Sequence, residues 1–244
     1  MRLPLANSSE TIEIGSFRDF YAFEQHVKTA RGRRGLDMLE AWYEQPVFYF
    51  SNHRSIVGDG ASVPVPPGCE WLDFELEIGC VIGREVHSPT AAEAMDCVLG
   101  FTIVNDLSAR DLQRKEMAVG LGPAKGKDFA TAVGPAIVPM DDLREIWDDS
   151  GRPRLEMVAR VNGRELSRGN AIDMHFSWPQ LIEHAGRGVT LYPGDLLGSG
   201  TVGTGCILEL GPENTGGWLK PGDTVELEIE RLGKLTTTIT NSKD

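Results

Sequence analysis

The sequence has few cysteines and no long hydrophobic run. Its four cysteines are scattered and none forms a C-x-x-C pair, so the common zinc and redox motifs built on such pairs are not expected. Scattered single thiols are typical of a reducing compartment, and no apolar segment approaches the length of a membrane span. Residues 1–7 also lack the apolar region of a secretion signal. We therefore expect a cytoplasmic protein that does not act in a membrane.

Basic residues are in a clear minority. The chain has 24 Lys and Arg against 36 Asp and Glu, which gives a net charge of −12. This charge argues against nucleic acid and against an anionic membrane surface as partners. It leaves room for a small anionic substrate, because a local site can be basic on an acidic protein. The sequence has no G-x-S-x-G elbow, so a serine hydrolase has no support. Its histidines also lack the i, i+4 spacing of a pair of metal ligands.

The chain is long enough for one large all-β domain, or for one domain with a smaller appendage. It has 244 residues, of which 41% are hydrophobic. The proline-rich segment 63–68 cannot occupy a central strand. We expect it to link a small N-terminal segment, residues 1–65, to a main domain, residues 66–244. The later part of the chain favours strands, with a hairpin turn at Asn162-Gly163 and one helix over 178–185.

Apolar and acidic residues alternate over Phe74–Ile78. In a β-strand, successive side chains point to opposite faces, so Glu75 and Glu77 share one face and the three apolar residues share the other. Two carboxylates directed to one point repel each other unless a cation or a proton lies between them. A hard divalent cation prefers such oxygen ligands. The same alternation at Glu226–Glu230 is interpreted as an ordinary acidic face, because Lys and Arg lie nearby in the sequence.

The N-terminal region offers two further polar candidates. The segment Ser16–His26 is expected to begin a helix, with Ser16 or Asp19 as its cap. On such a helix Asp19 and His26 lie on the same side. The basic segment 28–37 follows, and it fits either a surface loop or a lid whose arginines meet an anionic substrate.

Another polar group lies at a helix start in the middle of the chain. A buried strand ends there, and a helix is expected over residues 108–116. The spacing places Asp106, Arg110 and Gln113 on one stripe of this helix. They fit either the wall of a site or a cap followed by two solvated residues. Lys127 lies in a glycine-bearing loop and fits either a pocket or the surface.

The glycine-rich segment Gly198–Gly203 matches the spacing of a dinucleotide-binding fingerprint, which requires a following helix. We expect a strand over Cys206–Leu210 instead, so we reject this interpretation. Close approach of the glycine backbone to some other ligand remains compatible with the sequence.

Taken in chain order, these residues resemble the fumarylacetoacetate hydrolase family. The resemblance runs from about Asp19 to the end of the chain. The presence of Asp19 and His26 favours the fumarylacetoacetase type of that family, because many isomerase, hydratase and decarboxylase members lack them in this form. The motifs that carry the resemblance are Asp19-Phe20-Tyr21 with His26, Glu75-x-Glu77, Asn105-Asp106 through Gln113, Leu121-Gly122-Pro123 with Gly126-Lys127, Gly198-x-Gly200-Thr201, and Leu208-Glu209-Leu210.

The resemblance implies a mainly β fold, a mixed β-sandwich and β-roll with a few short helices, and a homodimer. It implies a bound Mg²⁺ or Ca²⁺, with Mn²⁺ as a further candidate, held by Asp19, Glu75, Glu77 and Asp106. It also implies roles for the other candidates: His26 and Glu209 activate water, Arg110, Gln113 and Lys127 stabilise negative charge, and Tyr21, Tyr49 and Thr201 contact substrate. Arg31, Arg33 and Arg34 are offset from the substrate arginine of the family, so the resemblance does not identify which of them takes that role.

These expectations describe a metal-dependent hydrolase that cleaves a C–C bond in a 1,3-diketo acid of the fumarylacetoacetate or acylpyruvate type. Histidine, with an ordinary pKa near ~6.5, suits a general base at neutral pH. The alternative on the same fold is a decarboxylase, isomerase or hydratase of 2-oxo acids. A non-enzymatic metal-binding module is disfavoured, because a structural cation site does not need His26, Lys127 and Glu209 around it.

Overall fold

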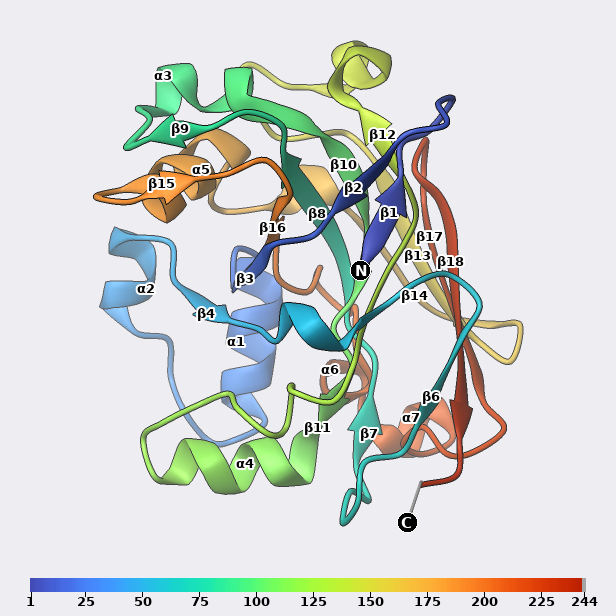
Figure 1. Ribbon diagram of the computed structural model, residues 1–244. Coiled ribbons are helices and arrows are strands. Elements are labelled where there is room, and N and C mark those ends of the chain that lie inside the picture. Colours follow the sequence, from blue (N-terminus) through green and yellow to red (C-terminus); the bar gives the residue numbers. More distant parts are fainter. Residues whose placement is uncertain (243–244) are drawn as a thin grey trace.

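The computed structural model describes residues 1–242 and is built on two β-sheets (Figure 1). The larger sheet has the strand order β4-β3-β16-β8-β10-β12-β5, and the smaller has the order β14-β13-β17-β18-β6. The smaller sheet lies at the right of Figure 1, where β18 packs against β12 of the larger sheet. The expected mainly β fold with a few short helices is confirmed.

The strands of the larger sheet are β3 (Ser16–Phe20), β4 (Phe48–Phe50), β5 (Ile56–Val57), β8 (Leu76–Ile82), β10 (Val98–Asn105), β12 (Thr131–Pro139) and β16 (Asp195–Gly198). Those of the smaller sheet are β6 (Ala61–Pro64), β13 (Glu156–Val161), β14 (Arg164–Asn170), β17 (Thr224–Ile229) and β18 (Gly233–Thr240). Three two-stranded pairs complete the strands: β1 (Arg2–Pro4) with β2 (Thr11–Glu13), β7 (Leu72–Asp73) with β11 (Ser108–Ala109), and β9 (Val86–His87) with β15 (Thr190–Leu191).

The α-helices lie around the larger sheet. They are α1 (Glu24–Gly32), α2 (Glu40–Glu44), α3 (Ala91–Ala94), α4 (Arg110–Ala118), α5 (Trp178–Gly186), α6 (Ile207–Leu210) and α7 (Pro212–Thr215). Helix α5 begins after a capping box between Ser177 and Gln180. The helix predicted over 178–185 is therefore confirmed. Helices α1 and α4 lie at the lower left of Figure 1, and α1 packs against α6.

Each face of the larger sheet has its own core. Phe74, Leu76 and Ile78 are fully buried in the main core, so their predicted common face is confirmed. Complete burial of one such side chain contributes roughly 1.5–3 kcal/mol. On the opposite face a smaller cluster includes Leu3 of β1 and Val81 of β8. The acidic face of the alternating segment therefore points toward the smaller cluster.

The segment Ser16–Phe20 is a strand, so the helix expected to begin there is wrong; α1 begins only at Glu24. Strand β3 pairs in parallel with β16, and this partner lies about 180 residues further along the chain. Local spacing alone could not identify it. The strand expected over Cys206–Leu210 is also wrong, because residues 207–210 form α6.

Residues 1–65 contribute strands to both sheets. Strands β3, β4 and β5 belong to the larger sheet, and β6 pairs in parallel with β18 at the edge of the smaller one. The edge position suits Pro64, because proline lacks the N–H that a central strand uses on both sides. Within residues 1–242, no helix combines the length and the apolar character needed to cross a membrane.

The second acidic alternation behaves as predicted. Glu226 pairs with Lys234 at 3.0 Å, and Glu228 pairs with Arg160 at 2.6 Å, both across neighbouring strands of the smaller sheet. The glutamates therefore lie on an ordinary paired face, whereas Glu75 and Glu77 are buried.

Candidate active site

Three adjacent strands of the larger sheet place polar groups at one end of the same face. Phe17 of β3 and Val81 of β8 are buried in the smaller cluster, and Asp19 and Glu77 lie further along these strands on the same side. Between them, Gly198 of β16 is paired in register with Asp19. A Cβ atom on Gly198 would collide with Oδ1 of Asp19 and press on Oε2 of Glu77. The glycine therefore leaves the space in which the two carboxylates meet.

Asp19, Glu77 and Asp106 form a buried carboxylate group. One oxygen from each lies within 4.8 Å of the others. Within the described part of the chain, Asp19 Oδ1 and Glu77 Oε2 have no hydrogen-bond partner. Burial raises the pKa of both side chains, and repulsion from Asp106 adds to the effect; repulsion from Asp19 raises the pKa of Glu77 further. Carboxylate oxygens that converge without hydrogen-bond donors are typical ligands of a hard divalent cation.

Glu75 lies beside this group but is engaged by cationic side chains. Its Oε1 accepts from Arg110 Nη2 at 2.7 Å, and its Oε2 lies 2.5 Å from Lys127 Nζ. Lys127 Nζ is also 2.5 Å from Asp106 Oδ2. Burial alone would raise the pKa of Glu75, but Arg110 and Lys127 outweigh it and hold that pKa below its usual range. The same acids raise the pKa of Lys127 against the effect of burial. Lys127 therefore stays charged between two carboxylates.

Two of the three predicted substrate residues touch the carboxylates. The Tyr49 hydroxyl donates to Asp106 Oδ2 at 2.6 Å, and the Thr201 hydroxyl donates to Glu77 Oε1 at 3.3 Å. The third, Tyr21, packs edge-on against the ring of His26. Burial raises the pKa of Tyr21 to about 12, so its hydroxyl remains a donor at neutral pH. All three side chains line the same pocket or its carboxylate wall.

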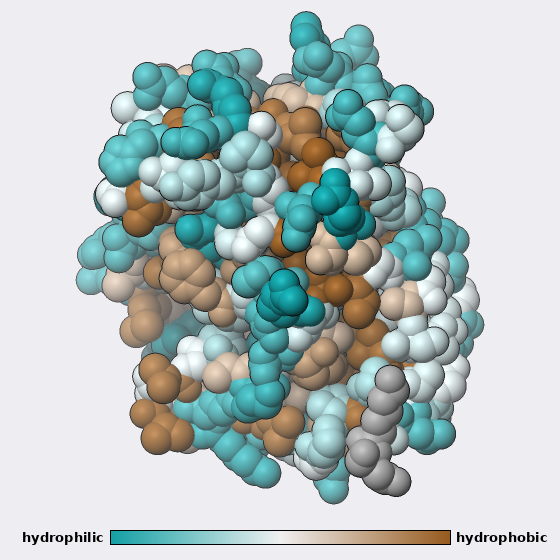
Figure 2. All heavy atoms as spheres, in the orientation of Figure 1, coloured by the Kyte–Doolittle hydropathy of each residue, from teal (hydrophilic) through white to brown (hydrophobic). Residues whose placement is uncertain are grey.

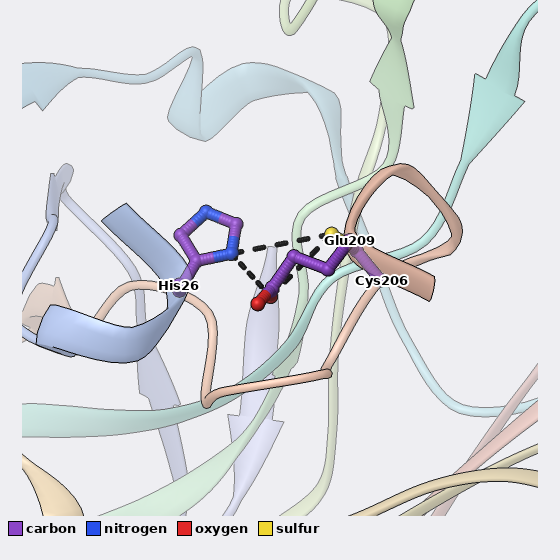
Figure 3. Close-up of side chains that lie close together, drawn as sticks. All are labelled: His26, Cys206 and Glu209. Carbon is purple, nitrogen blue, oxygen red and sulfur yellow. Dashed lines mark hydrogen bonds and ion pairs between the residues drawn. The ribbon is translucent and has the colours of Figure 1, made fainter. Parts of the chain in front are cut away.

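His26 and Glu209 form a buried pair next to the carboxylates (Figure 3). His26 Nδ1 lies 2.5 Å from Glu209 Oε1, and the Thr204 N–H donates to the second carboxylate oxygen at 3.1 Å. In Figure 3 the other ring nitrogen of His26 points away from Glu209. Because the carboxylate accepts, Nδ1 carries the proton and Nε2 is free to accept one. The structure thus brings together His26 from α1 and Glu209 from α6.

Asp73 is a site residue that the sequence analysis missed. Its buried carboxylate accepts from Arg110 Nε at 2.9 Å and from the N–H groups of Ile207 and Leu208 at 2.7 and 3.0 Å. Asp73 therefore holds both Arg110 and the start of α6. The signal was present, because Asp73 precedes Glu75 by two residues and continues the same alternation of acids.

The site opens into a pocket of ~620 Å³ that is locally basic. Its lining contains six basic side chains against three acidic ones, Asp19, Glu75 and Glu77. The basic ones are Arg31, Arg33, Arg34, Arg110, Arg114 and Lys127. Gln113 also lines the pocket and accepts from Arg110 Nη1 at 3.3 Å. A basic pocket on a chain of net charge −12 fits a small anionic ligand.

The three arginines at the end of α1 are held differently. Arg31 Nε donates to the carbonyl of Asp37 at 2.5 Å, and Arg33 donates to the carbonyl of Glu209 at 3.2 Å. Arg34 reaches toward α4, where Nη1 lies 3.6 Å from the thioether sulfur of Met117. Its charge acts on the hydroxyl of Tyr21. Arg34 therefore lines the pocket without an acidic partner in residues 1–242.

The rim next to α4 is hydrophobic. Figure 2 shows hydrophobic side chains gathered at the lower left of this face, in the region of α4. Val119 and Leu121, which follow the helix, are 82% and 81% exposed. The next residues, Gly122 and Pro123, line the pocket. An apolar edge therefore borders the basic entrance.

The fold and the site define a mainly β protein with a carboxylate-lined, locally basic pocket for a small molecule. The family model for the C-terminal part of fumarylacetoacetate (FAA) hydrolase matches residues 16–240. The chain belongs to this family, whose enzymes include hydrolases and tautomerases.

Three similar proteins illustrate the range of the family. The mitochondrial oxaloacetate tautomerase of Homo sapiens is 35% identical over 78% of this chain and 57% of its own. The 2,4-didehydro-3-deoxy-L-rhamnonate hydrolase of a Sphingomonas strain is 34% identical over 78% of this chain and 63% of its own. These matches span less than two thirds of either relative. The fumarylpyruvate hydrolase of Pseudomonas aeruginosa, solved with Mn²⁺ and pyruvate, has a TM-score of 0.80 at 20% identity, over 99% of this chain and 96% of its own. This likeness shows the fold.

Proposed function

We propose that the protein is a metal-dependent hydrolase that cleaves a C–C bond in a 1,3-diketo acid of the fumarylpyruvate or acylpyruvate class. The observation that carries this proposal is the 2.5 Å contact between His26 Nδ1 and Glu209 Oε1 beside the carboxylate group. A histidine backed by a buried carboxylate is the arrangement that activates a nucleophile. Isomerisation of a 2-oxo acid also needs a base, but it needs no activated water.

The carboxylate group suits Mg²⁺, Ca²⁺ or Mn²⁺, since its ligand atoms are all oxygens. Asp19, Glu77 and Asp106 would hold the ion, and Glu75 is the fourth candidate ligand. When bound, the ion would supply Lewis acidity to the oxygens of a diketo substrate. The P. aeruginosa protein, crystallised with Mn²⁺ and pyruvate, supports a divalent cation and a 2-oxo acid as ligands.

The proposed reaction begins with water positioned by His26. Nε2 of His26 takes a proton from the water while the water oxygen adds to the acyl carbonyl carbon. Glu209 stabilises the imidazolium that forms. The bond between that carbon and the central carbon then breaks, and its electron pair moves onto the departing fragment as an enolate. The imidazolium returns a proton to this fragment. The products are a carboxylic acid and a 2-oxo acid.

Positive charge in the pocket wall would stabilise the anions of this sequence. Arg110 and Lys127 are buried and held charged by Glu75. Gln113 adds an amide that is oriented by Arg110. Donors fixed before the reaction need no reorganisation as charge develops, and removing one typically costs on the order of 3 kcal/mol in the barrier. In the pocket, Arg34 would receive the carboxylate of the substrate.

The second candidate is a tautomerase or another enzyme of 2-oxo acids, such as an isomerase, hydratase or decarboxylase. The oxaloacetate tautomerase relatives favour it. It uses the same cation and the same basic pocket, but moves a proton between carbon and oxygen without splitting the chain.

A product assay separates the two candidates. Purified protein with Mg²⁺ is incubated with an acylpyruvate and, separately, with the enol form of oxaloacetate. We expect two products from the acylpyruvate, and no reaction after the cation is chelated. His26→Ala should lower the hydrolytic rate about 10²–10⁴-fold and leave Mg²⁺ binding by calorimetry unchanged. His87→Ala, an exposed histidine, is the control. Hydrolysis that survives His26→Ala, or tautomerisation without any cleavage, would overturn the proposal.

We also propose a homodimer in the cytoplasm. Its support is the family resemblance, large exposed side chains such as Phe50, which is 70% exposed, and four unpaired cysteines. Sedimentation equilibrium of the purified chain tests the dimer, and a monomer at micromolar concentration would contradict it.

A further inference from the structure

A second set of ligand atoms lies next to the carboxylate group and differs from it in kind. His26 Nδ1, Cys206 Sγ and a Glu209 oxygen lie within 4.8 Å of one another, and all three residues are buried (Figure 3). The carboxylate group offers only oxygens. The second set offers nitrogen, sulfur and oxygen, which is the donor set that zinc prefers.

We infer that His26, Cys206 and Glu209 form a Zn²⁺ site, and that zinc bound there inhibits the enzyme. The zinc would coordinate His26 Nδ1 and so replace its hydrogen bond to Glu209. The inhibitory part rests on the proposed role of His26 as a base. The zinc site itself does not depend on that role.

The distances suit zinc after small side-chain movements. Bonds of roughly 2.0–2.3 Å in a tetrahedral site place neighbouring ligand atoms roughly 3.3–3.5 Å apart. Cys206 Sγ is 4.0 Å from His26 Nδ1 and 3.8 Å from Glu209 Oε1, so each sulfur distance shortens by a few tenths of an ångström. The 2.5 Å contact between Nδ1 and Oε1 must open by less than ~1 Å. Three protein ligands leave a fourth position for water or for a substrate oxygen.

The charge of the site also favours a divalent ion. Zn²⁺ with one thiolate, one carboxylate and a neutral imidazole has a net charge of zero, so no uncompensated charge is buried. The thiol of Cys206 loses its proton to solvent on binding. The proton of His26 moves from Nδ1 to Nε2, since zinc now occupies Nδ1.

This transfer explains the inhibition. Nε2 is the atom that must accept a proton from water, and in the zinc form it already carries one. Glu209 is also withdrawn from the imidazole, because its oxygen becomes a zinc ligand. The ion can approach through the pocket, which His26 lines.

Cobalt spectroscopy tests the site without reference to activity. The protein is first saturated with Mg²⁺ to fill the carboxylate group and then titrated with Co²⁺, which replaces zinc and absorbs in the near ultraviolet when a thiolate binds it. We expect this charge-transfer band to saturate at one equivalent. Cys206→Ser should abolish it. The control is Cys69→Ser, which removes a partly exposed thiol outside the set and should leave the band unchanged.

Inhibition is measured separately, with each rate normalised to that of the same variant without zinc. The zinc concentration for half-inhibition should rise about tenfold or more in Cys206→Ser, since even an outer partner of a metal ligand is typically worth ~10–100-fold in affinity. Equal inhibition of the wild type and this variant would place zinc at the carboxylate group and overturn the inhibitory role.

The absence of the band in the wild-type protein would overturn the site, whatever the variants do. Its persistence in Cys206→Ser, or in Cys206→Ala if the serine variant does not fold, would do the same. The cobalt band requires no substrate. If the protein does not catalyse the proposed hydrolysis, the cobalt titration still decides whether the zinc site exists.

Discussion

Arg110 donates from Nε to the buried carboxylate of Asp73 at 2.9 Å. This ion pair connects the His26–Glu209 pair with the carboxylate group of the candidate site. Asp73 also accepts the first two N–H groups of α6, the helix that carries Glu209. The other end of the Arg110 guanidinium reaches Glu75 at 2.7 Å. One chain of contacts therefore runs from the His–Glu pair to the carboxylate wall.

Replacing Asp73 by alanine should destabilise the whole protein. The change leaves the buried Arg110 with one acidic partner in place of two, and leaves two N–H groups of α6 without an acceptor. Loss of one partner of a buried pair typically costs about 3–5 kcal/mol. Because Glu75 remains as a partner of Arg110, we expect a stability loss of about 3 kcal/mol in this variant. Urea unfolding measures the difference.

Glu228→Ala is the matched control. This glutamate also pairs with an arginine, Arg160 at 2.6 Å, but its side chain is 46% exposed. Exposed pairs contribute about 0.2–1 kcal/mol, so the loss should stay below about 1 kcal/mol. Equal stability losses in the two variants would contradict the anchoring role of Asp73.

Removal of the divalent cation should make stability depend on pH. The pKa values of Asp19 and Glu77 are raised in the folded protein, so the folded chain binds more protons than the unfolded chain above about pH 4. The free energy of unfolding of the cation-free protein should therefore fall as pH rises from about 4 through the raised pKa values. A cation takes the place of these protons.

Thermal unfolding of chelator-treated protein at about pH 5 and about pH 8, with and without Mg²⁺, measures this dependence. Mg²⁺ at ~100 times its dissociation constant should add about 2.7 kcal/mol, and the required concentration should be lower at the higher pH. A midpoint that does not respond to Mg²⁺ at either pH would show that these carboxylates do not bind it.

Gly198→Ala should disturb the carboxylate group. The added methyl group would collide with Oδ1 of Asp19 and press on Oε2 of Glu77, and both are backed by packed strands. Overpacking of this kind typically costs about 1–3 kcal/mol, and Mg²⁺ affinity by calorimetry should fall with it. Gly15→Ala is the control, because its Cβ would meet no atom within 4 Å. Unchanged Mg²⁺ affinity in Gly198→Ala would show that the space left by Gly198 is not needed for cation binding.

Arg34→Ala should weaken binding of an anionic substrate without slowing the chemical step. Arg34 lines the pocket but contacts Ala30 and Met117 rather than His26 or the carboxylates, so KM should rise about 10–100-fold while kcat changes little. Arg34→Lys should recover only part of this loss, because an ammonium does not offer the paired donors of a guanidinium. Steady-state kinetics with an acylpyruvate measures both variants. A fall in kcat at constant KM would assign Arg34 a different role.

Local patterns in the sequence were enough to locate part of the site. The alternation over Phe74–Ile78 correctly gives the buried apolar face, and the same alternation extended by two residues would have included Asp73. The paired face at Glu226–Glu230 was also predicted correctly, since its lysine and arginine partners lie on neighbouring strands. Periodicity reports which side of a strand is buried, and the Lys and Arg near Glu226–Glu230 distinguished that segment from the first.

Other parts of the site depend on contacts that a local pattern does not contain. Ser16–Phe20 is a strand because β16 pairs with it from far along the chain, and this tertiary contact overrides the helix cap that Ser16 or Asp19 suggested. Residues 207–210 form a helical turn because Asp73 caps them. The cluster of Cys206 with His26 was not anticipated either, since it follows from that turn.

The position of β16 has a consequence for synthesis of the chain on the ribosome. This strand lies between β3 and β8, and the ribosome makes it long after both of them. Until it arrives, the facing edges of β3 and β8 have no neighbour, and exposed edges of this kind invite pairing with other chains. Nascent chains that stall before residue 195 should therefore be aggregation-prone intermediates that bind chaperones, and the sheet should close only after β16 has been made.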